Sequence, residues 1–130
     1  MIVAIGVDAV EIARIHDLIQ RSGDRFIERM FSEAEASYCR SRSNPSESFA
    51  ARFAAKEAVM KCLGTGWTEG LAFQQIEVER LDSGDTQLAV TGEAAQRAKA
   101  LGIGRWHVSL THTERTATAF VVAESGTAKA

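Results

Sequence analysis

The sequence has few of the residues that mark specialised protein classes. Its 130 residues include one proline and two cysteines, and only 7% are aromatic. Cys39 and Cys62 are too few for a disulfide framework or a zinc pattern, so we interpret them as reduced thiols of a cytoplasmic protein. No apolar run is long enough to cross a membrane. The apolar N-terminus is interrupted by Asp8 and Glu11 and lacks the basic region of a signal peptide.

An excess of charge of one sign is also missing. The sequence has 15 Lys and Arg residues and 17 Asp and Glu residues, which gives a net charge of -2. This balance argues against a general nucleic-acid binder. The length predicts one domain over residues 1–130, and 45% hydrophobic residues are enough for its core. An enzyme of this size that acts on a large substrate often borrows surface from a second subunit.

The residue patterns predict an α+β fold, with a mostly antiparallel sheet packed against a long central helix. Apolar or alternating runs predict strands over 2–8, 74–81, 86–91, 106–112 and 116–124. Helical patterns cover 10–22, 26–30, 32–40, a long segment that ends at 63, and 92–101. Strands and helices do not alternate regularly, which argues against a doubly wound sheet.

Two helix starts carry recognisable caps. Ser32 with Glu35 three residues later fits a capping box. For the long helix, Ser46 or Ser48 is the predicted N-cap.

The most informative stretch is RFAAKEAVMKCLGTG, from Arg52 to Gly66. Helical spacing aligns one row that contains charged residues, Phe53, Glu57, Lys61 and Gly64, and one row of small residues, Ala51, Ala55, Ala58 and Cys62. Glu57 and Lys61 could form a simple salt bridge of ~0.2–0.5 kcal/mol. Their apolar and alanine-rich surroundings instead favour a charged partner. We therefore expect an anion or metal–phosphate site here, with a neighbouring strand or subunit packed on the small residues.

The glycine turn that follows is not a Walker loop. Gly64, Thr65 and Gly66 come after a helix, whereas a phosphate-binding loop precedes one. Gly64 is first a helix C-cap, and it also allows a ligand to approach the backbone.

Asp8 and His112 each have two interpretations. Asp8, with Glu11 three residues later, is either the N-cap of the next helix or a Mg²⁺ ligand that pairs with Glu57. Strand alternation puts Trp106, Val108, Leu110 and His112 on one face. His112 is then either a structural hydrogen-bonding residue or a general base, for which a pKa near ~6.5 is suitable.

Together these segments resemble the holo-acyl-carrier-protein synthase family, the small 4′-phosphopantetheinyl transferases. The family's first signature is matched by Gly6-Val7-Asp8-Ala9-Val10-Glu11-Ile12, with Ala9 in place of Ile or Leu. Its specific central signature is matched from Arg52 to Gly66, where only Cys62 differs. Its last signature is matched by Val108-Ser109-Leu110-Thr111-His112-Thr113, with Thr111 replacing Ser. Gly84-Asp85-Thr86 departs from the Gly-Lys-Pro turn of many relatives.

The resemblance implies transfer of phosphopantetheine from coenzyme A to a serine of apo acyl carrier protein, with release of 3′,5′-ADP. This reaction supports fatty acid biosynthesis. The implied metal ligands are Asp8 and Glu57, which hold Mg²⁺ at the pyrophosphate. Lys61 and His112 lie at the cofactor phosphates, and together with Glu57 they form the implied catalytic set. The general base is either His112 directly or Glu57 through a bound water, and we favour the second.

The remaining implied contacts concern the nucleotide and the partners. Arg52 resembles the arginine that meets the nucleotide's phosphate, and the turn of Gly64, Thr65 and Gly66 lies beside the adenosine. The family forms homotrimers with active sites between subunits, so Asp8 and His112 could come from one chain and the central helix from the next. An acidic carrier protein docks on Arg14, Arg21 and Arg25, unless these belong to a mixed-charge surface. Two alternatives to an enzyme come from other functional classes. One is a coenzyme A-binding module without turnover, and the other is a purely structural trimer subunit.

Overall fold

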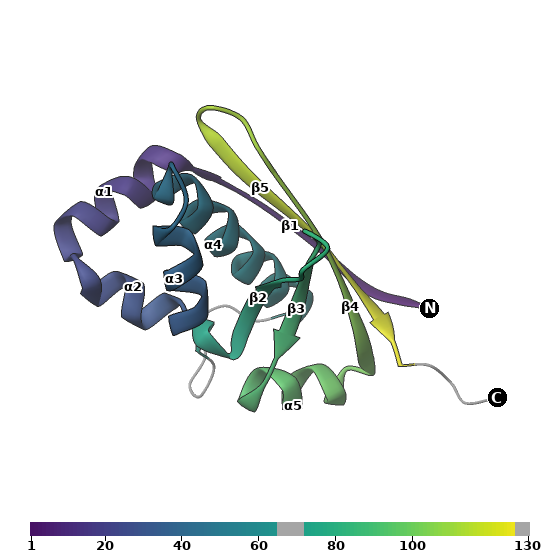
Figure 1. Ribbon diagram of the computed structural model, residues 1–130. Coiled ribbons are helices and arrows are strands. Elements are labelled where there is room, and N and C mark those ends of the chain that lie inside the picture. The colour runs from purple at the N-terminus through teal and green to yellow at the C-terminus, as the bar shows by residue number, and fades with distance from the viewer. Residues whose placement is uncertain (65–71, 127–130) are drawn as a thin grey trace.

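The protein is an α+β structure in which the sheets and helices gather around one long helix (Figure 1). The computed structural model describes residues 1–64 and 72–126. Its strands are β1 (Ile2–Glu11), β2 (Ile76–Arg80), β3 (Thr86–Val90), β4 (Ile103–His112) and β5 (Thr116–Ser125). Its helices are α1 (Ile12–Ser22), α2 (Asp24–Met30), α3 (Glu33–Arg40), α4 (Pro45–Cys62) and α5 (Gly92–Ala100), with a 3₁₀ turn at Phe73–Gln75. The predicted fold class is confirmed.

Both sheets are antiparallel. One has three strands in the order β1-β5-β4, and the other is the β2-β3 hairpin. The inner face of the larger sheet packs on α4, and α1 to α3 lie on the side of α4 away from that sheet (Figure 1). No helix in the described part of the chain has both the length and the apolar character needed to cross a membrane.

The caps only partly match the predictions. The capping box is confirmed, since the Ser32 amide donates to Glu35 Oε1 at 2.9 Å and the Glu35 amide donates to Ser32 Oγ at 3.1 Å. The predicted serine caps of α4 are wrong. Asn44 is the N-cap, because Pro45 has no N–H and fits the first helical position. The capping interpretation of Asp8 is also wrong, because β1 runs on to Glu11 and the N-cap of α1 is Glu11.

The small-residue row of α4 is covered by the chain's own sheet. A Cβ at Gly6 would lie 2.1 Å from the carbonyl oxygen of Ala58 and 3.1 Å from Cys62 Sγ. Glycine in β1 and the small residues of α4 therefore allow the two backbones to approach closely. Of the two expected occupants of this row, the structure shows the neighbouring strand.

A buried ion pair fixes α4 to the rest of the fold. Lys56 and Glu35 are both fully buried, and Lys56 Nζ donates to Glu35 Oε1 at 2.8 Å. It also donates to the carbonyl oxygens of Phe73, at 3.0 Å, and Ile76. Glu35 Oε2 accepts from the Val78 amide at 2.7 Å. Burial lowers the pKa of Lys56, and the Glu35 carboxylate opposes this effect. The pair connects α3, α4 and β2.

We expect Lys56→Met to lower the free energy of unfolding by about 3–5 kcal/mol, because it leaves Glu35 buried without its cation. Urea denaturation followed by circular dichroism measures this loss. The exposed Lys99→Met is the matched control and should change stability by less than about 0.5 kcal/mol. A loss below about 1 kcal/mol for Lys56→Met would mean that the fold does not depend on the pair.

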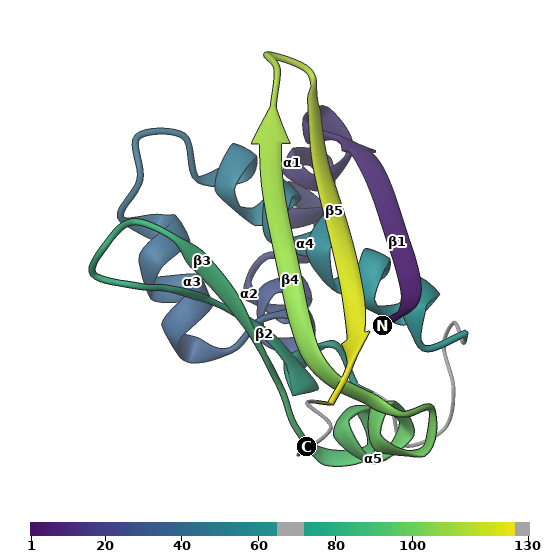
Figure 2. The ribbon, with the colours of Figure 1, turned by 90° about the vertical axis from the view of Figure 1, so that its right-hand side faces the viewer.

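Where β1 meets β5, the outer face of the larger sheet carries apolar side chains that no described element covers (Figure 2). Ile5, Val7 and Phe120 point outward and are 55%, 48% and 47% exposed. Val7 pairs with Phe120, and Ile5 pairs with Val122, so these side chains form one continuous patch, the outer apolar patch. A contiguous apolar patch of this kind is typical of an interaction surface.

Both thiols are buried and unreactive. Burial raises the pKa of Cys39 to about 11 and also raises the pKa of Cys62. Both therefore stay protonated near neutral pH and are poor nucleophiles.

Candidate active site

The predicted site residues lie in two separate groups, which we call half-sites. The first half-site lies where β1 crosses α4 and contains Asp8, Glu57 and Lys61. Lys61 Nζ donates to the Val7 carbonyl oxygen at 2.8 Å and to Asp8 Oδ1 at 3.2 Å. The Asp8 side chain is only 18% exposed, whereas the Lys61 side chain is 55% exposed. Lys61 thus pairs across the strand–helix contact with Asp8. Its ion pair is not with Glu57, one turn away on the same helix.

The surroundings of Glu57 in the first half-site disfavour its negative charge. Burial raises the pKa of Glu57, and the negative charge of Asp8 raises it further. The cations of Lys61 and Arg14 lower the pKa of Glu57, but these opposing effects are smaller. A carboxylate whose charge is disfavoured by burial and by a second carboxylate is a setting that a divalent cation stabilises.

The donor set of the first half-site fits Mg²⁺. Asp8 and Glu57 offer carboxylate oxygens, the ligands that Mg²⁺ prefers. Among the described residues, no group of three or more His, Cys, Asp or Glu side chains could hold a metal. A pair of carboxylates is nevertheless enough for Mg²⁺, which usually keeps waters and substrate phosphate oxygens as its other ligands.

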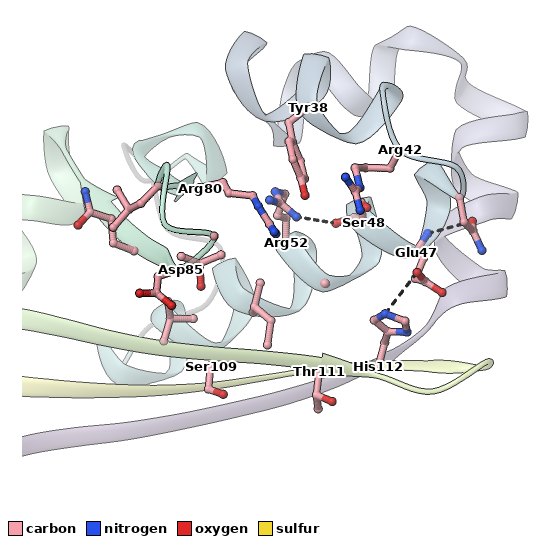
Figure 3. A pocket seen from close by; sticks show the side chains of 18 of the residues that line it. Tyr38, Arg42, Glu47, Ser48, Arg52, Arg80, Asp85, Ser109, Thr111 and His112 are labelled. Carbon is pink, nitrogen blue, oxygen red and sulfur yellow. Dashed lines mark hydrogen bonds and ion pairs between the residues drawn. The ribbon is translucent and has the colours of Figure 1, made fainter.

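The second half-site is a cleft of about 740 Å³ that contains Arg52 and His112 (Figure 3). Its walls come from α3, the start of α4, the β2–β3 turn and the end of β4. His112 Nε2 lies 3.3 Å from Glu47 Oε1, and His112 Nδ1 lies 3.3 Å from the Thr113 carbonyl oxygen. The predicted strand alternation is confirmed, since Trp106, Val108 and Leu110 are partly buried against the core while the residues between them are exposed. His112 pairs with the buried Ala117 and so lies on the same face.

Arg52 is the buried cation of the cleft. Its exposure is 5%, and its terminal nitrogen lies 3.5 Å from the Ser48 carbonyl oxygen. Arg52 Nε is the buried side-chain nitrogen that lacks a hydrogen-bond partner within the described residues. A buried guanidinium with an unused donor indicates a place for an anion.

Helix α4 separates the two half-sites. In the sheet register, Asp8 pairs with Ala119, which pairs with Leu110, and His112 lies one inward-facing position beyond Leu110. Asp8 and His112 are therefore on the same sheet face but two strands apart, about 10 Å across the sheet. Helix α4 packs on that face between them. The structure brings Asp8 to Glu57 and Lys61 of its own chain, which corrects the expectation that Asp8 and the central helix come from different chains.

The other predicted residues lie at the edges of these half-sites. Gly64 follows α4 with a φ of 71°, as a C-cap glycine does, and its amide donates to the Lys61 carbonyl oxygen at 3.1 Å. Thr65 and Gly66 lie outside the described residues. The expected docking arginines, Arg14 and Arg21 on α1 and Arg25 on α2, are all exposed.

The sequence analysis missed three residues of the cleft. Tyr38, Arg42 and Arg80 come from α3, the loop after it and the end of β2, and they meet beside Arg52 (Figure 3). No local spacing pointed to this convergence, because it depends on the β2-β3 hairpin packing beside α3.

Comparison with known proteins finds relatives along almost the whole chain. The family model described as 4'-phosphopantetheinyl transferase superfamily matches residues 4–120. A holo-[acyl-carrier-protein] synthase of Koribacter versatilis is 48% identical over 124 residues, covering 95% of this chain and 99% of that protein.

Solved structures show the same fold. The crystal structure of the holo-[acyl-carrier-protein] synthase from Neisseria meningitidis matches with a TM-score of 0.86 at 33% identity, covering 96% of this chain and 100% of that chain. The Helicobacter pylori enzyme of the same name, solved in complex with coenzyme A, matches with a TM-score of 0.81 at 30% identity, covering 92% and 99% of the two chains.

Proposed function

Because the chain belongs to the 4′-phosphopantetheinyl transferase superfamily, we propose that it is a holo-acyl-carrier-protein synthase. Residues 1–130 act as one transferase domain. The enzyme transfers 4′-phosphopantetheine from coenzyme A to a serine of an apo acyl carrier protein and releases 3′,5′-ADP. The reaction takes place in the cytoplasm and supplies active carrier protein to fatty acid biosynthesis.

The observation that carries this proposal is the placement of two carboxylates around one lysine: Asp8 forms an ion pair with Lys61, and both lie close enough to Glu57 to change its pKa. The oxygens of the two carboxylates would hold Mg²⁺, which supplies a positive charge to the pyrophosphate oxygens when bound. Lys61 lies 3.2 Å from Asp8 and is more than half exposed, so its ammonium can turn to a phosphate that arrives at the carboxylates. Positioned cations stabilise the charge that develops on phosphoryl oxygens, which is the main requirement of phosphoryl transfer.

Glu57 is the best-placed proton acceptor. Its carboxylate is neither fully buried nor held in an ion pair within the described residues, so it can accept a hydrogen bond from a water molecule. It accepts the proton of the carrier protein's serine hydroxyl through a water molecule. His112 lies beside Glu47 in the other half-site, so we assign it, with Arg52, to the phosphates of the nucleotide.

The two half-sites are completed between subunits of a homotrimer. Two observations support this part of the proposal: α4 separates Asp8, Glu57 and Lys61 from Arg52 and His112, and the outer apolar patch has no described partner within the chain. One subunit gives the carboxylates and Lys61, and its neighbour gives the cleft. A site built at the interface allows a chain of 130 residues to surround a ligand as large as coenzyme A.

We expect Phe120→Glu to convert the trimer into monomers, because it puts a charge at the centre of the outer apolar patch. Sedimentation equilibrium measures the mass, and transfer activity should fall together with the trimer. Leu101→Glu is the matched control, since Leu101 is also exposed, at 41%, but lies outside this patch. A monomeric wild-type protein with full activity would overturn the interface proposal.

The exposed arginines of α1 and α2 form the docking surface for the carrier protein. Arg14 and Arg21 are seven residues apart and so share one face of α1, and Arg25 follows on α2. Arg14 is also close enough to Glu57 to lower the pKa of its carboxyl group. An acidic carrier protein on this surface would therefore bring its serine toward the first half-site.

Mass spectrometry of a carrier protein tests the proposed function. The protein is mixed with coenzyme A, Mg²⁺ and a validated apo acyl carrier protein, and the carrier is then weighed. A gain of one phosphopantetheine group is the expected result. No gain, with coenzyme A still bound, would favour a binding module without turnover. No gain and no effect of coenzyme A or Mg²⁺ on thermal stability would favour a purely structural subunit.

A further inference from the structure

Three arginines surround one aromatic ring at the wall of the cleft, and we infer that Tyr38 is a positioning residue that holds them together as a phosphate site. The guanidinium carbons of Arg52, Arg42 and Arg80 lie 4.5, 5.4 and 5.5 Å from the centre of the Tyr38 ring. All three distances are within the range of a cation–π interaction.

The ring is the feature that these arginines share. Arg42 follows α3, Arg52 lies in the second turn of α4, and Arg80 ends β2, so they come from three separate parts of the fold. Figure 3 shows Tyr38 beside Arg52, with Arg42 and Arg80 on opposite sides of them. Like charges at such distances repel each other, and the negative face of the aromatic ring offsets that repulsion.

The cluster carries unbalanced positive charge. Within residues 1–64 and 72–126, none of the three guanidiniums has a carboxylate within 4.0 Å, although other arginines do form such pairs, for example Arg40 with Asp24. Of the two acids that line the cleft, Glu47 pairs with His112, and Asp85 accepts a hydrogen bond from Ser83. Arg52 is almost completely buried and has an unpaired Nε. A buried guanidinium that faces a cleft and has no carboxylate partner favours the binding of an anion.

The geometry favours a phosphate monoester over a diester. Guanidinium groups bind phosphate oxygens through pairs of N–H donors, and three positive charges favour a phosphate dianion over the monoanion of a diester. This inference rests on the proposed function, in which the nucleotide end of coenzyme A carries a 3′-phosphate monoester. The pyrophosphate belongs to the other half-site, with Asp8, Glu57 and Lys61.

Kinetics with coenzyme A and dephospho-coenzyme A test the inference, because the two substrates differ only in that phosphate. Tyr38→Leu should raise the KM for coenzyme A about tenfold and leave kcat within about twofold. The KM for dephospho-coenzyme A should change by less than about twofold, since the cluster has no phosphate to bind in that substrate. Tyr38→Phe keeps the ring and should restore the wild-type KM for both.

Two further variants make the result decisive. Arg80→Gln removes one exposed cation of the cluster and should raise only the KM for coenzyme A, even if Tyr38→Leu fails to fold. Arg40→Gln changes an arginine on α3 that pairs with Asp24 outside the cleft, and it should leave both KM values unchanged.

The outcomes separate this inference from the proposed function. A wild-type protein that transfers no phosphopantetheine refutes the proposed function. A wild-type protein that transfers it, with equal losses on both substrates in Tyr38→Leu and Arg80→Gln or with no loss on either, refutes the role of Tyr38.

Discussion

Replacing Glu57 with glutamine is expected to reduce transfer by about a thousandfold or more while the fold stays intact. Glutamine has nearly the same shape, but it neither holds Mg²⁺ well nor accepts a proton. The fold should tolerate the change, because Glu57 forms no ion pair within the described residues and its charge is disfavoured by burial and by Asp8. A carboxyl group whose pKa is raised on folding is destabilising when ionised, so removing the charge should keep the melting temperature equal or raise it.

Mass spectrometry of the carrier protein measures the activity of Glu57→Gln, and differential scanning calorimetry measures its stability. Glu93→Gln is the matched control, since Glu93 is exposed in the first turn of α5, away from both half-sites, and this variant should be fully active. A fully active Glu57→Gln variant would remove Glu57 from the metal site and from proton transfer. An unfolded one would show that its carboxylate is structural.

Gly6→Ala is expected to prevent folding. The added methyl carbon would lie 2.1 Å from the Ala58 carbonyl oxygen, far inside van der Waals contact, and that oxygen belongs to the backbone of α4. No side-chain rotation can relieve the clash, so β1 must move away from α4. That movement would separate Asp8 from Glu57 and expose the small-residue row. Overpacking of flexible side chains costs about 1–3 kcal/mol, and a clash between two backbones costs more.

Soluble yield and the cooperativity of urea unfolding measure the effect of Gly6→Ala. Gly126→Ala provides a matched control, because a Cβ there meets the Gly104 Cα at 3.7 Å, an ordinary contact. It should unfold like the wild type. If Gly6→Ala is folded and active, then β1 does not need to lie this close to α4 for catalysis.

The sequence predicted the components of the first half-site because they depend on local periodicity. Glu57 and Lys61 are one helical turn apart on α4. Asp8 follows the N-terminal apolar run and lies at an inward-facing position of β1. These three residues come together only if β1 packs on α4, and the sequence patterns did not establish that packing. Gly6 and Ala58 allow that packing, but only the three-dimensional contact shows why both must be small.

Two other features could not be predicted from local patterns. In the sequence, nothing distinguishes Lys56 from the other charged residues of an alanine-rich helix. Its three hydrogen-bond acceptors belong to Glu35, Phe73 and Ile76, which are far away in the sequence. The arginines around Tyr38 likewise come from three separate elements. Such convergence is tertiary, so propensity and spacing carry no information about it. The cap of α4 was a local error: the proline already marked the first helical position, and Asn44 before it was the better choice.

The position of α4 between the half-sites has a consequence for assemblies that mix normal and defective chains. If each interface forms one site, every chain contributes carboxylates to one site and a nucleotide cleft to another. A chain that lacks only its carboxylate would then silence a single site and still serve its neighbour through its intact cleft. In such an assembly activity would depend on the contacts between chains, and mixed assemblies of normal and defective copies would lose it gradually, in proportion to the defective copies present.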